Sequence, residues 1–320
     1  VIGSGATAVT IVPVMAEEGA DVTMLQRSPT YMVSRPARDP FANKLRKFLP
    51  EKIAYAITRW KNINHQRFTY WYARRNPAKL GERLVDMARQ ELPDTVDVDK
   101  HFVPKYGPWE QRLCLVPDSD MFKAISSGKA KVVTEHIDQF TKTGIQLKSG
   151  EHLDADIIVT ATGLNLVTMG KTAISIDGAP VNFGEHFNYK GVMFNDIPNL
   201  ASVFGYINAS WTLKTDIVAD YVCRLLWKMD DKNATVAMPH LDDVNMPRLP
   251  FVTDFSSGYF ARSFDKLPKN GDRHPWRVLQ DYKAEKKILS EDAVDDGVMV
   301  FSNPVAVHRA ETVETLLAAE

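Results

Sequence analysis

The chain opens with Val1-Ile2-Gly3-Ser4-Gly5-Ala6-Thr7-Ala8-Val9, and this stretch decides the fold. Its first two residues are typical of the end of a buried strand, and the apolar residues after it predict a helix that ends at Gly19. The pattern in between, G-x-G-x-x-A, matches the phosphate loop of a dinucleotide-binding βα unit. In such a loop Gly3 permits the tight turn, Gly5 lets the backbone approach a pyrophosphate, and Ala8 lets the helix pack closely. A glycine-rich turn without a ligand is the structural alternative.

The second predicted strand, residues 21–25, is followed by Gln26-Arg27-Ser28. An acidic side chain at this place would accept hydrogen bonds from the ribose hydroxyls of NAD. Arg27 instead offers a charged donor to a 2′-phosphate, and Ser28 adds a hydroxyl. The sequence therefore favours NADP(H) over NAD(H), with a solvated surface arginine as the alternative interpretation.

Composition excludes several classes of protein. The 320 residues are 44% apolar and 25% charged, which excludes wholesale disorder, and the length suggests two domains. The net charge of −1 gives no global attraction to nucleic acid. Cys114 and Cys223 are too far apart for a CxxC redox pair or a zinc cluster, and the histidines lack ligand spacing, so we predict no metal. No apolar run approaches the roughly 18 residues of a membrane span.

Residues 35–83 are strongly basic, with 13 Lys or Arg against 3 Asp or Glu, and aromatic residues are interleaved with them. Helical spacing here predicts a helical insertion in the nucleotide-binding domain, at about residues 36–100. Three interpretations stay open: a solvated helical face, attraction to anionic lipid or to the NADPH phosphates, and nucleic-acid binding. Nucleic-acid binding is the least favoured, because the rest of the chain carries a net charge of −11 and contains no recognition module.

The middle of the chain alternates between short strands and turns. Residues 156–161 form a continuous apolar run that ends at Thr162-Gly163, and this run predicts a strand buried on both faces. Further short strands are predicted at residues 131–140, 144–148 and 152–153, after a proline-marked loop at residues 93–118.

A Gly/Asn turn at residues 205–210 precedes a predicted helix with Leu213, Ile217, Tyr221, Leu225 and Met229 at steps of four. Ser210 is a candidate N-cap, and the free N–H groups of the helix start can hold the polar edge of a ligand. A plain capped helix is the equal alternative. From Met238 onward the sequence is rich in proline and predicts few helices, with a strand at residues 298–301 and a helical tail at residues 310–319.

In their order along the chain, five motifs resemble the class B flavoprotein monooxygenases of the Baeyer–Villiger type, from Val1 to about Phe301. The resemblance implies an α/β fold: a Rossmann-like NADP-binding domain at residues 1–161 and the returning C-terminal part of an FAD-binding domain at residues 162–320. The family's N-terminal FAD-binding Rossmann domain and its His/Trp-Pro fingerprint are missing. Since the chain also starts without Met inside a strand, we expect a cytoplasmic protein that has lost its N-terminus and is inactive by itself. The five motifs are Val1–Val9, Gln26–Pro29, Gln111–Pro117, Ala161–Gly163 and Gly205–Trp211.

The resemblance also implies roles for particular residues. Arg112, in Gln-Arg-Leu-Cys-Leu, matches the family's catalytic arginine, although members often have Lys where this chain has Gln111. From the residues alone, an ion pair of Arg112 with Glu110 or Asp118 is the other interpretation. Arg27 and Ser28 would bind the 2′-phosphate of NADPH, and Gly163, Asn208 and Ser210 would approach FAD. The NADPH pyrophosphate would lie on Gly3, Ser4, Gly5, Ala6, Thr7, Ala8 and Val9.

The implied activity uses FAD and NADPH to insert one oxygen atom of O2 into a hydrophobic ketone, or onto the sulfur of a sulfide or thioamide, through a C4a-peroxyflavin. An N-hydroxylating flavin monooxygenase and a non-catalytic NADP(H)-binding protein are the alternatives. A disulfide reductase is disfavoured, because the chain lacks a close pair of cysteines. The expected partners are a small hydrophobic substrate and O2, without nucleic acid, and a peripheral membrane surface that the basic segment contacts.

Overall fold

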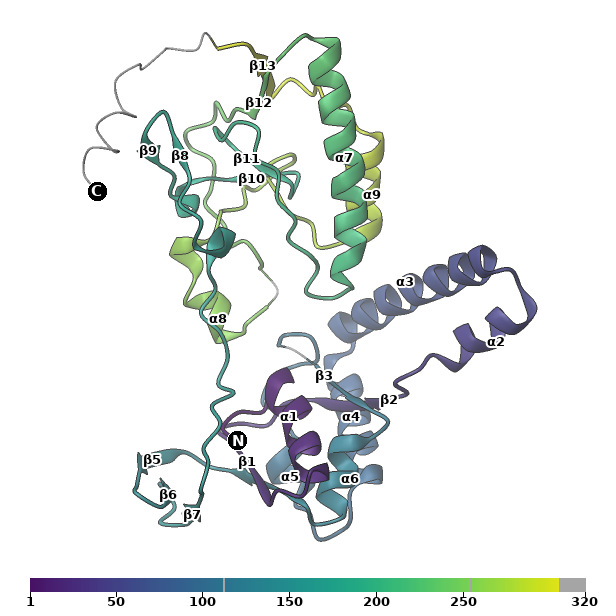
Figure 1. The fold of residues 1–320 in the computed structure, drawn as a ribbon, viewed down its shortest axis with the longest axis vertical. Coiled ribbons are helices and arrows are strands. Elements are labelled where there is room, and N and C mark those ends of the chain that lie inside the picture. The colour runs from purple at the N-terminus through teal and green to yellow at the C-terminus, as the bar shows by residue number, and fades with distance from the viewer. Residues whose placement is uncertain (112, 254, 305–320) are drawn as a thin grey trace, which may run out of the picture. The chain divides into compact units, whose positions relative to one another are not determined.

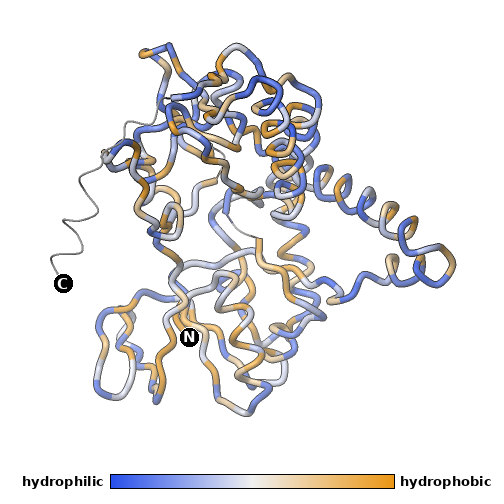
Figure 2. Tube along the Cα trace, turned by 45° about the horizontal axis from the view of Figure 1, so that its top comes forward, coloured by the Kyte–Doolittle hydropathy of each residue, from blue (hydrophilic) through white to orange (hydrophobic). Residues whose placement is uncertain are grey.

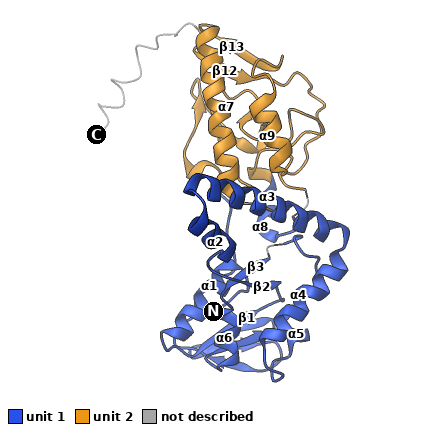
Figure 3. Ribbon diagram, turned by 90° about the vertical axis from the view of Figure 1, so that its right-hand side faces the viewer, with its two compact units in different colours: residues 1–167, 254–264 blue, residues 168–253, 265–320 orange. Residues whose placement is uncertain are grey.

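The computed structural model describes residues 1–111, 113–253 and 255–304. The chain divides into two compact units (Figure 3). The first comprises residues 1–167 and 254–264, and the second comprises residues 168–253 and the residues from 265 onward. The assignment of residues 1–161 to an NADP-binding domain and of residues 162–320 to an FAD-binding domain stays a prediction.

The first unit is built on parallel strand pairs (Figure 1). Strand β1 (Val22–Gln26) pairs in parallel with β4 (Ala130–Thr134), and β2 (Met32–Arg35) pairs in parallel with β3 (Cys114–Pro117). Ile2 extends this pattern, because it bridges in parallel to both Leu25 and Thr160. Helix α1 (Ala6–Glu17) connects Ile2 to β1. Parallel strands joined through helices confirm the predicted α/β fold.

The predicted helical insertion corresponds to a run of helices after β2. Asp39 caps the first of them, because its side chain accepts hydrogen bonds from the backbone N–H groups of Phe41 and Ala42. Further along, α6 (Asp120–Ser126) follows β3. The helices after β2 are α2 (Pro40–Phe48), α3 (Glu51–Arg75), α4 (Pro77–Glu91) and α5 (Val98–Phe102).

The core of the first unit lies between α1, the parallel strands and helices α4 and α6. Val9 and Val12 of α1 are buried, as is Met24 of β1. Cys114 is buried in the same core, where it packs as a small apolar side chain. The glycine loop is therefore anchored on its inner side by ordinary apolar packing.

The predicted strand at residues 131–140 is two strands, because the chain breaks at Glu135 and His136 between β4 and β5 (Ile137–Phe140). Strand β5 pairs antiparallel with β6 (Gly144–Leu147), which pairs antiparallel with β7 (His152–Asp154). This meander confirms the other two predicted strands.

The prediction of a strand buried on both faces at residues 156–161 is wrong. Ile157 is 76% exposed and Ile158 is 36% exposed, and within this run only Thr160 makes a strand bridge. The bridge pairs Thr160 with Ile2, the second residue of the chain, so among the described residues no strand continues alongside Ile157 and Ile158. An apolar run is buried as a strand only where neighbouring strands and helices cover it.

The second unit is organised around α7 (Trp211–Asp231), which packs on α9 (Tyr282–Glu291). The predicted apolar face of α7 is confirmed, since Leu213, Ile217, Tyr221 and Leu225 are buried. Strands β12 (Val236–Pro239) and β13 (Met299–Ser302) pair antiparallel, and β13 confirms the strand predicted at residues 298–301. Two hairpins complete the strands: β8 (Ser175–Ile176) with β9 (Ala179–Pro180), and β10 (Asn188–Tyr189) with β11 (Met193–Phe194).

Helix α9 was not predicted, because the many prolines after Met238 favoured loops. Asp281 caps it by accepting hydrogen bonds from the N–H groups of Lys283 and Ala284. The short α8 (Gly258–Ala261) belongs to the first unit. The helical tail predicted at residues 310–319 lies outside the described residues. Along the described part of the chain, no helix is both long and apolar enough to cross a bilayer.

Candidate functional site

The glycine loop requires glycine at its first position. Gly3 has a φ of +124°, and a Cβ added there would lie 2.3 Å from the carbonyl oxygen of Ala161. An L-residue at position 3 would therefore be strained and would also clash with the segment that leaves the sheet. The loop and residues 160–161 form one rigid junction, because the N–H of Ala161 also donates to the carbonyl oxygen of Ile2 at 2.7 Å.

Gly5 is different, because its missing side chain leaves open space. A Cβ added to Gly5 would have no atom within 4 Å, and Gly5 is the N-cap of α1. Among the residues that the structure describes, no side chain caps this helix. Its first turn holds no acidic residue, and Ala6 and Thr7 are exposed. The N–H groups of the first turn are thus directed at open space with the positive end of the helix dipole behind them. This arrangement suits a phosphate group.

The predicted loop residues divide into two sets. Ala8 and Val9 are buried, so their side chains pack the helix on the sheet and cannot contact a ligand. Ser4 joins the loop to the end of β1, because its hydroxyl donates to the carbonyl oxygen of Ser28 at 3.2 Å. The structure therefore brings the glycine loop and the Gln26–Ser28 motif together, as the sequence predicted.

Arg27 is exposed at the end of β1, and it forms no hydrogen bond or ion pair with any residue that the structure describes. Its neighbour Gln26 is buried and directed inward, where its Nε2 donates at 2.8 Å to the carbonyl oxygen of His101 and to Oγ1 of Thr134. Burial, together with nearby Lys100, lowers the pKa of His101 below its ordinary value. Within the Gln26–Ser28 motif, Gln26 is structural, and Arg27 is the cation available to a ligand.

The motif that contains Arg112 also reaches the glycine loop. Sγ of Cys114, the first residue of β3, lies 3.8 Å from the carbonyl oxygen of Ser4. Arg112 itself lies outside the described residues. Its two alternative ion-pair partners have other hydrogen bonds: Glu110 accepts from the N–H of Gly107 at 2.8 Å, and Asp118 accepts from the N–H of Ala37 at 3.1 Å.

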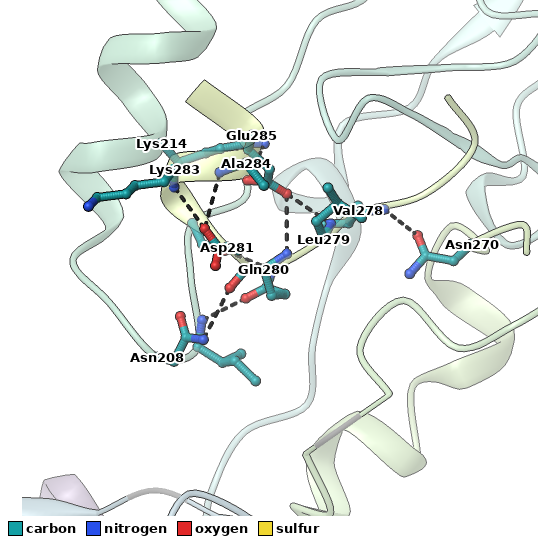
Figure 4. A network of polar contacts seen from close by, with 12 residues as sticks. Asn208, Lys214, Asn270, Val278, Leu279, Gln280, Asp281, Lys283, Ala284 and Glu285 are labelled. Atoms are coloured by element: carbon teal, nitrogen blue, oxygen red, sulfur yellow. Dashed lines mark hydrogen bonds and ion pairs between the residues drawn. The ribbon is translucent and has the colours of Figure 1, made fainter. Parts of the chain in front are cut away.

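The second unit holds the turn at residues 205–211 through the side chain of Gln280 (Figure 4). Oε1 of Gln280 accepts from the N–H of Ile207 at 2.9 Å, and its Nε2 donates to the carbonyl oxygen of Gly205 at 3.4 Å. The side chain of Asn208 donates back to the carbonyl oxygen of Gln280 at 3.1 Å. One amide side chain therefore fixes both a donor and an acceptor of the turn.

Gln280 is held in turn by a buried ion pair (Figure 4). Glu285 Oε1 accepts from the N–H groups of Leu279 and Gln280, at 3.0 and 3.3 Å, and its Oε2 lies 3.0 Å from Nζ of Lys214. The side chains of Lys214 and Glu285 are both buried. Burial, with the nearby Glu285 charge, also raises the pKa of Tyr206. The pair thus connects the first turn of helix α7 to α9. It also connects α7 to Leu279 and Gln280, the segment that holds the turn at residues 205–211.

Sequence reasoning did not identify Lys214, Gln280 or Glu285. A signal existed for Lys214, because it stands on the same helical face as Val218, Tyr221 and Leu225, where a lysine needs a buried partner. The predicted N-cap Ser210 precedes α7, but its hydroxyl bonds to that of Thr212 at 2.9 Å and makes no cap hydrogen bond. Gly163, in the first unit, is exposed and has a φ of +107°.

The parallel βα unit, the open helix start and the exposed cation after β1 together form the arrangement that is typical of Rossmann-type dinucleotide-binding domains. Solved structures with a similar fold include a steroid monooxygenase bound to NADP (TM-score 0.68, 17% identity, 95% of this chain and 66% of that chain). Another is OTEMO in complex with FAD and NADP (TM-score 0.64, 17% identity, 94% and 66%). At these identities the likeness shows the fold, which is that of the two-dinucleotide flavoprotein monooxygenases.

No family model matches the chain, but relatives at higher identity cover nearly all of it. AlmA of Acinetobacter baylyi, described as a probable FAD-binding monooxygenase, is 47% identical over 315 residues, or 98% of this chain and 62% of AlmA. The FAD-containing monooxygenase EthA of Mycobacterium tuberculosis is 48% identical over 311 residues, or 96% of this chain and 63% of EthA. Over nearly all of its own length the chain is therefore similar to FAD-containing monooxygenases, and it spans about three fifths of the length of these relatives.

Proposed function

We propose that this chain is the NADP-binding part, with the adjoining C-terminal part of the FAD-binding domain, of an NADPH-dependent flavin monooxygenase. The observation that carries the proposal is the open start of α1 at Gly5, with Arg27 exposed on the strand end that Ser4 ties to the same loop. The names of AlmA and EthA, and the NADP bound to a neighbour of the same fold, support it.

The described residues fit NADPH. The N–H groups at the start of α1 would hold the pyrophosphate, and the empty space at Gly5 is where a side chain would obstruct it. Arg27 would pair with the 2′-phosphate, a group that NADH lacks, with Ser28 beside it. Hydrogen bonds to charged groups contribute about 1.5–3 kcal/mol, so Arg27 alone could provide roughly 10- to 100-fold selectivity.

The turn at residues 205–211 fits a role at FAD through its shape. Gln280 and Asn208 hold the backbone of the turn, and no side chain caps α7, so the first N–H groups of α7 are available to polar atoms of a ligand. Gly163 and Ser210 would approach the same cofactor. Because the side-chain amide of Asn208 donates to the carbonyl oxygen of Gln280, the contribution of Asn208 is to orient the turn.

When bound, NADPH would supply the hydride and FAD would activate O2, one oxygen atom of which is transferred to the substrate. The protein must hold the cofactors, exclude water and stabilise negative charge that develops on the substrate oxygen. We assign this last role to Arg112, because a guanidinium stays protonated at working pH and donates from a rigid plane. Loss of such a donor typically costs about 3–4 kcal/mol of transition-state stabilisation.

The substrate class that we propose is a hydrophobic ketone, converted to an ester or lactone, or a sulfide or thioamide oxidised at sulfur. A non-catalytic NADP(H)-binding protein is less favoured, because the relatives' names describe monooxygenases. An N-hydroxylating flavin monooxygenase uses the same cofactors and is the alternative enzyme. A spectrum with a flavin band that NADPH bleaches would separate the enzyme from the binding protein.

The experiment that tests the proposal uses the protein expressed from its complete gene, and compares NADPH with NADH for reduction of the bound flavin. Wild-type protein should prefer NADPH, and Arg27→Gln should raise the KM for NADPH roughly 10- to 100-fold while leaving the KM for NADH unchanged. Lys131→Gln, an exposed position on β4, is the matched control. Equal use of both nucleotides by wild-type protein would refute the proposal for Arg27.

Arg112→Ala tests the catalytic assignment separately. Flavin reduction by NADPH should persist, while formation of oxygenated product should fall by about 10²–10³-fold. Normal product formation by this variant would remove Arg112 from the reaction.

A further inference from the structure

The hairpin formed by α2 and α3, residues 40–75, carries a concentrated positive charge. It contains nine Lys or Arg and one Glu, a net charge of +8, whereas the whole chain has a net charge of −1. In Figure 1 the hairpin extends away from the sheet of the first unit. Helix α2 packs on α3, and α3 packs on α4. The charge is therefore displayed on an extension of the first unit.

Helix α3 also carries a stripe of exposed apolar side chains, which we call the hairpin stripe. At 100° per residue its members fall within an arc of about 80°, and they extend along about 27 Å of the helix. Trp60 is 68% exposed, Phe68 is 61% exposed and Trp71 is 47% exposed. The hydropathy colouring of Figure 2 shows apolar segments alternating with hydrophilic ones along this hairpin. The hairpin stripe consists of Ile53, Ile57, Trp60, Phe68 and Trp71.

Helix α2 covers a different side of α3. Lys61 of α3 bonds to Asp39 at the start of α2 at 3.0 Å and lies 4.5 Å from the ring centre of Phe41. Ala54 is buried. On the helical wheel Ala54 and Lys61 are about 70° from the centre of the hairpin stripe. The contact between the two helices therefore leaves the stripe uncovered.

Two aromatic side chains of the stripe lie against each other, and one of them also contacts a cation. The rings of Phe68 and Trp71 lie 5.8 Å apart, and the guanidinium of Arg75 lies 4.7 Å from the ring centre of Trp71. Tryptophan rings are favoured at the boundary between lipid and water, because one edge is polar and the rest is apolar. Arginine beside them would meet phosphate groups at the same depth.

We propose that the α2–α3 hairpin binds the surface of membranes that contain anionic lipids, with the hairpin stripe in the headgroup region. A solvated helical face does not require three large aromatic side chains on one line, and nucleic-acid binding does not require the aliphatic Ile53 and Ile57. Basic charge and an amphipathic apolar face together are the combination that an anionic bilayer attracts. None of the residues of this surface is among those proposed to bind NADP or FAD, so the inference goes beyond the proposed function.

The experiment is flotation of the protein from its complete gene with vesicles of phosphatidylcholine, alone or with phosphatidylglycerol, at low and high salt. Binding should require phosphatidylglycerol and weaken with salt. Replacing Lys44, Lys47 and Lys52 together by Gln should lower the partition coefficient on the order of 100-fold, at roughly fivefold per charge. Trp60→Ser and Trp71→Ser should each lower it roughly tenfold.

The matched control is Trp227→Ser, which removes a tryptophan that is 72% exposed on α7 in the other unit, and it should leave vesicle binding unchanged. Thermal unfolding midpoints like that of wild-type protein establish that the variants fold, and the lysine variant tests the proposal even if a tryptophan variant does not fold. Absence of binding to anionic vesicles at low salt would overturn it. A change in oligomer mass in the Trp60 and Trp71 variants, with vesicle binding unaffected, would instead make the stripe an interface between copies and would also overturn it.

Discussion

Removing one partner of the buried Lys214–Glu285 pair should destabilise the second unit strongly. In Lys214→Met, the carboxylate of Glu285 stays buried with only the N–H groups of Leu279 and Gln280 as described donors. An uncompensated buried charge costs about 3–5 kcal/mol, which for a unit of this size lowers the melting temperature by about 10 °C. The double variant Lys214→Met with Glu285→Gln should recover most of this loss, because the glutamine carbonyl can still accept from both N–H groups.

Differential scanning calorimetry of the protein from its complete gene, with single and double variants, measures this coupling. Lys228→Met is the control, because Lys228 pairs with Asp231 at the surface of the same helix at 2.7 Å, and it should leave the melting temperature unchanged. The reasoning fails if Lys214→Met lowers the melting temperature no more than the control, or if the double variant is less stable than both single variants.

Further predictions concern the loops and the pH dependence. Gly3→Ala should lower the thermal midpoint of the protein, whereas Gly5→Ala should keep that midpoint but weaken NADPH affinity measured by titration; equal effects on both quantities would contradict the two roles. Gln280→Ala should reduce the fraction of purified protein that carries FAD, measured by the flavin absorbance. In Gln280→Glu the carboxylate can still accept from the N–H of Ile207 but cannot donate to Gly205, so the flavin content should recover only in part. A wild-type flavin content in Gln280→Ala would show that Gln280 does not position the turn for FAD. Burial lowers the pKa of His101, so this residue should destabilise the protein as pH falls below about 6.5. In that range the unfolded state binds a proton at His101 more readily than the folded state does. His240, whose pKa Asp196 raises, should stabilise it below the same pH and lose that contribution as pH rises through its folded-state pKa. Thermal midpoints of His101→Gln and His240→Gln across this range should therefore change in opposite directions relative to wild-type protein.

The parts of the fold that depend on local sequence were predictable. The glycine loop, helix α1 and the apolar face of α7 follow from patterns within about 20 residues, since turn chemistry and helical spacing act over that range. Residues 156–161 show the limit of such patterns: their composition matches a buried strand, but burial depends on neighbours that the run does not contain. Helix α9 was missed because prolines dominate its surroundings, although Asp281 provides a capping signal at its start.

The residues that we propose to face a ligand are recognisable in the sequence, whereas the residues that support them are not. Arg27 and the loop glycines are recognisable because dinucleotide binding imposes a fixed spacing on them. The partnership of Lys214 with Glu285 joins residues that are 71 positions apart, and no local pattern specifies such a distance. The same holds for the contact of Cys114 with Ser4, which is 110 positions away in sequence.

The single hydrogen bond from Ser4 to Ser28 has a consequence for anyone who wishes to redesign this protein for a cheaper coenzyme. It joins the loop that we propose to hold the pyrophosphate to the segment that we propose to hold the 2′-phosphate, so a change that moves one would displace the other. Converting coenzyme preference by exchanging Arg27 for an acidic residue would therefore succeed best with Ser4 left in place, since the serine keeps the two recognition elements in register.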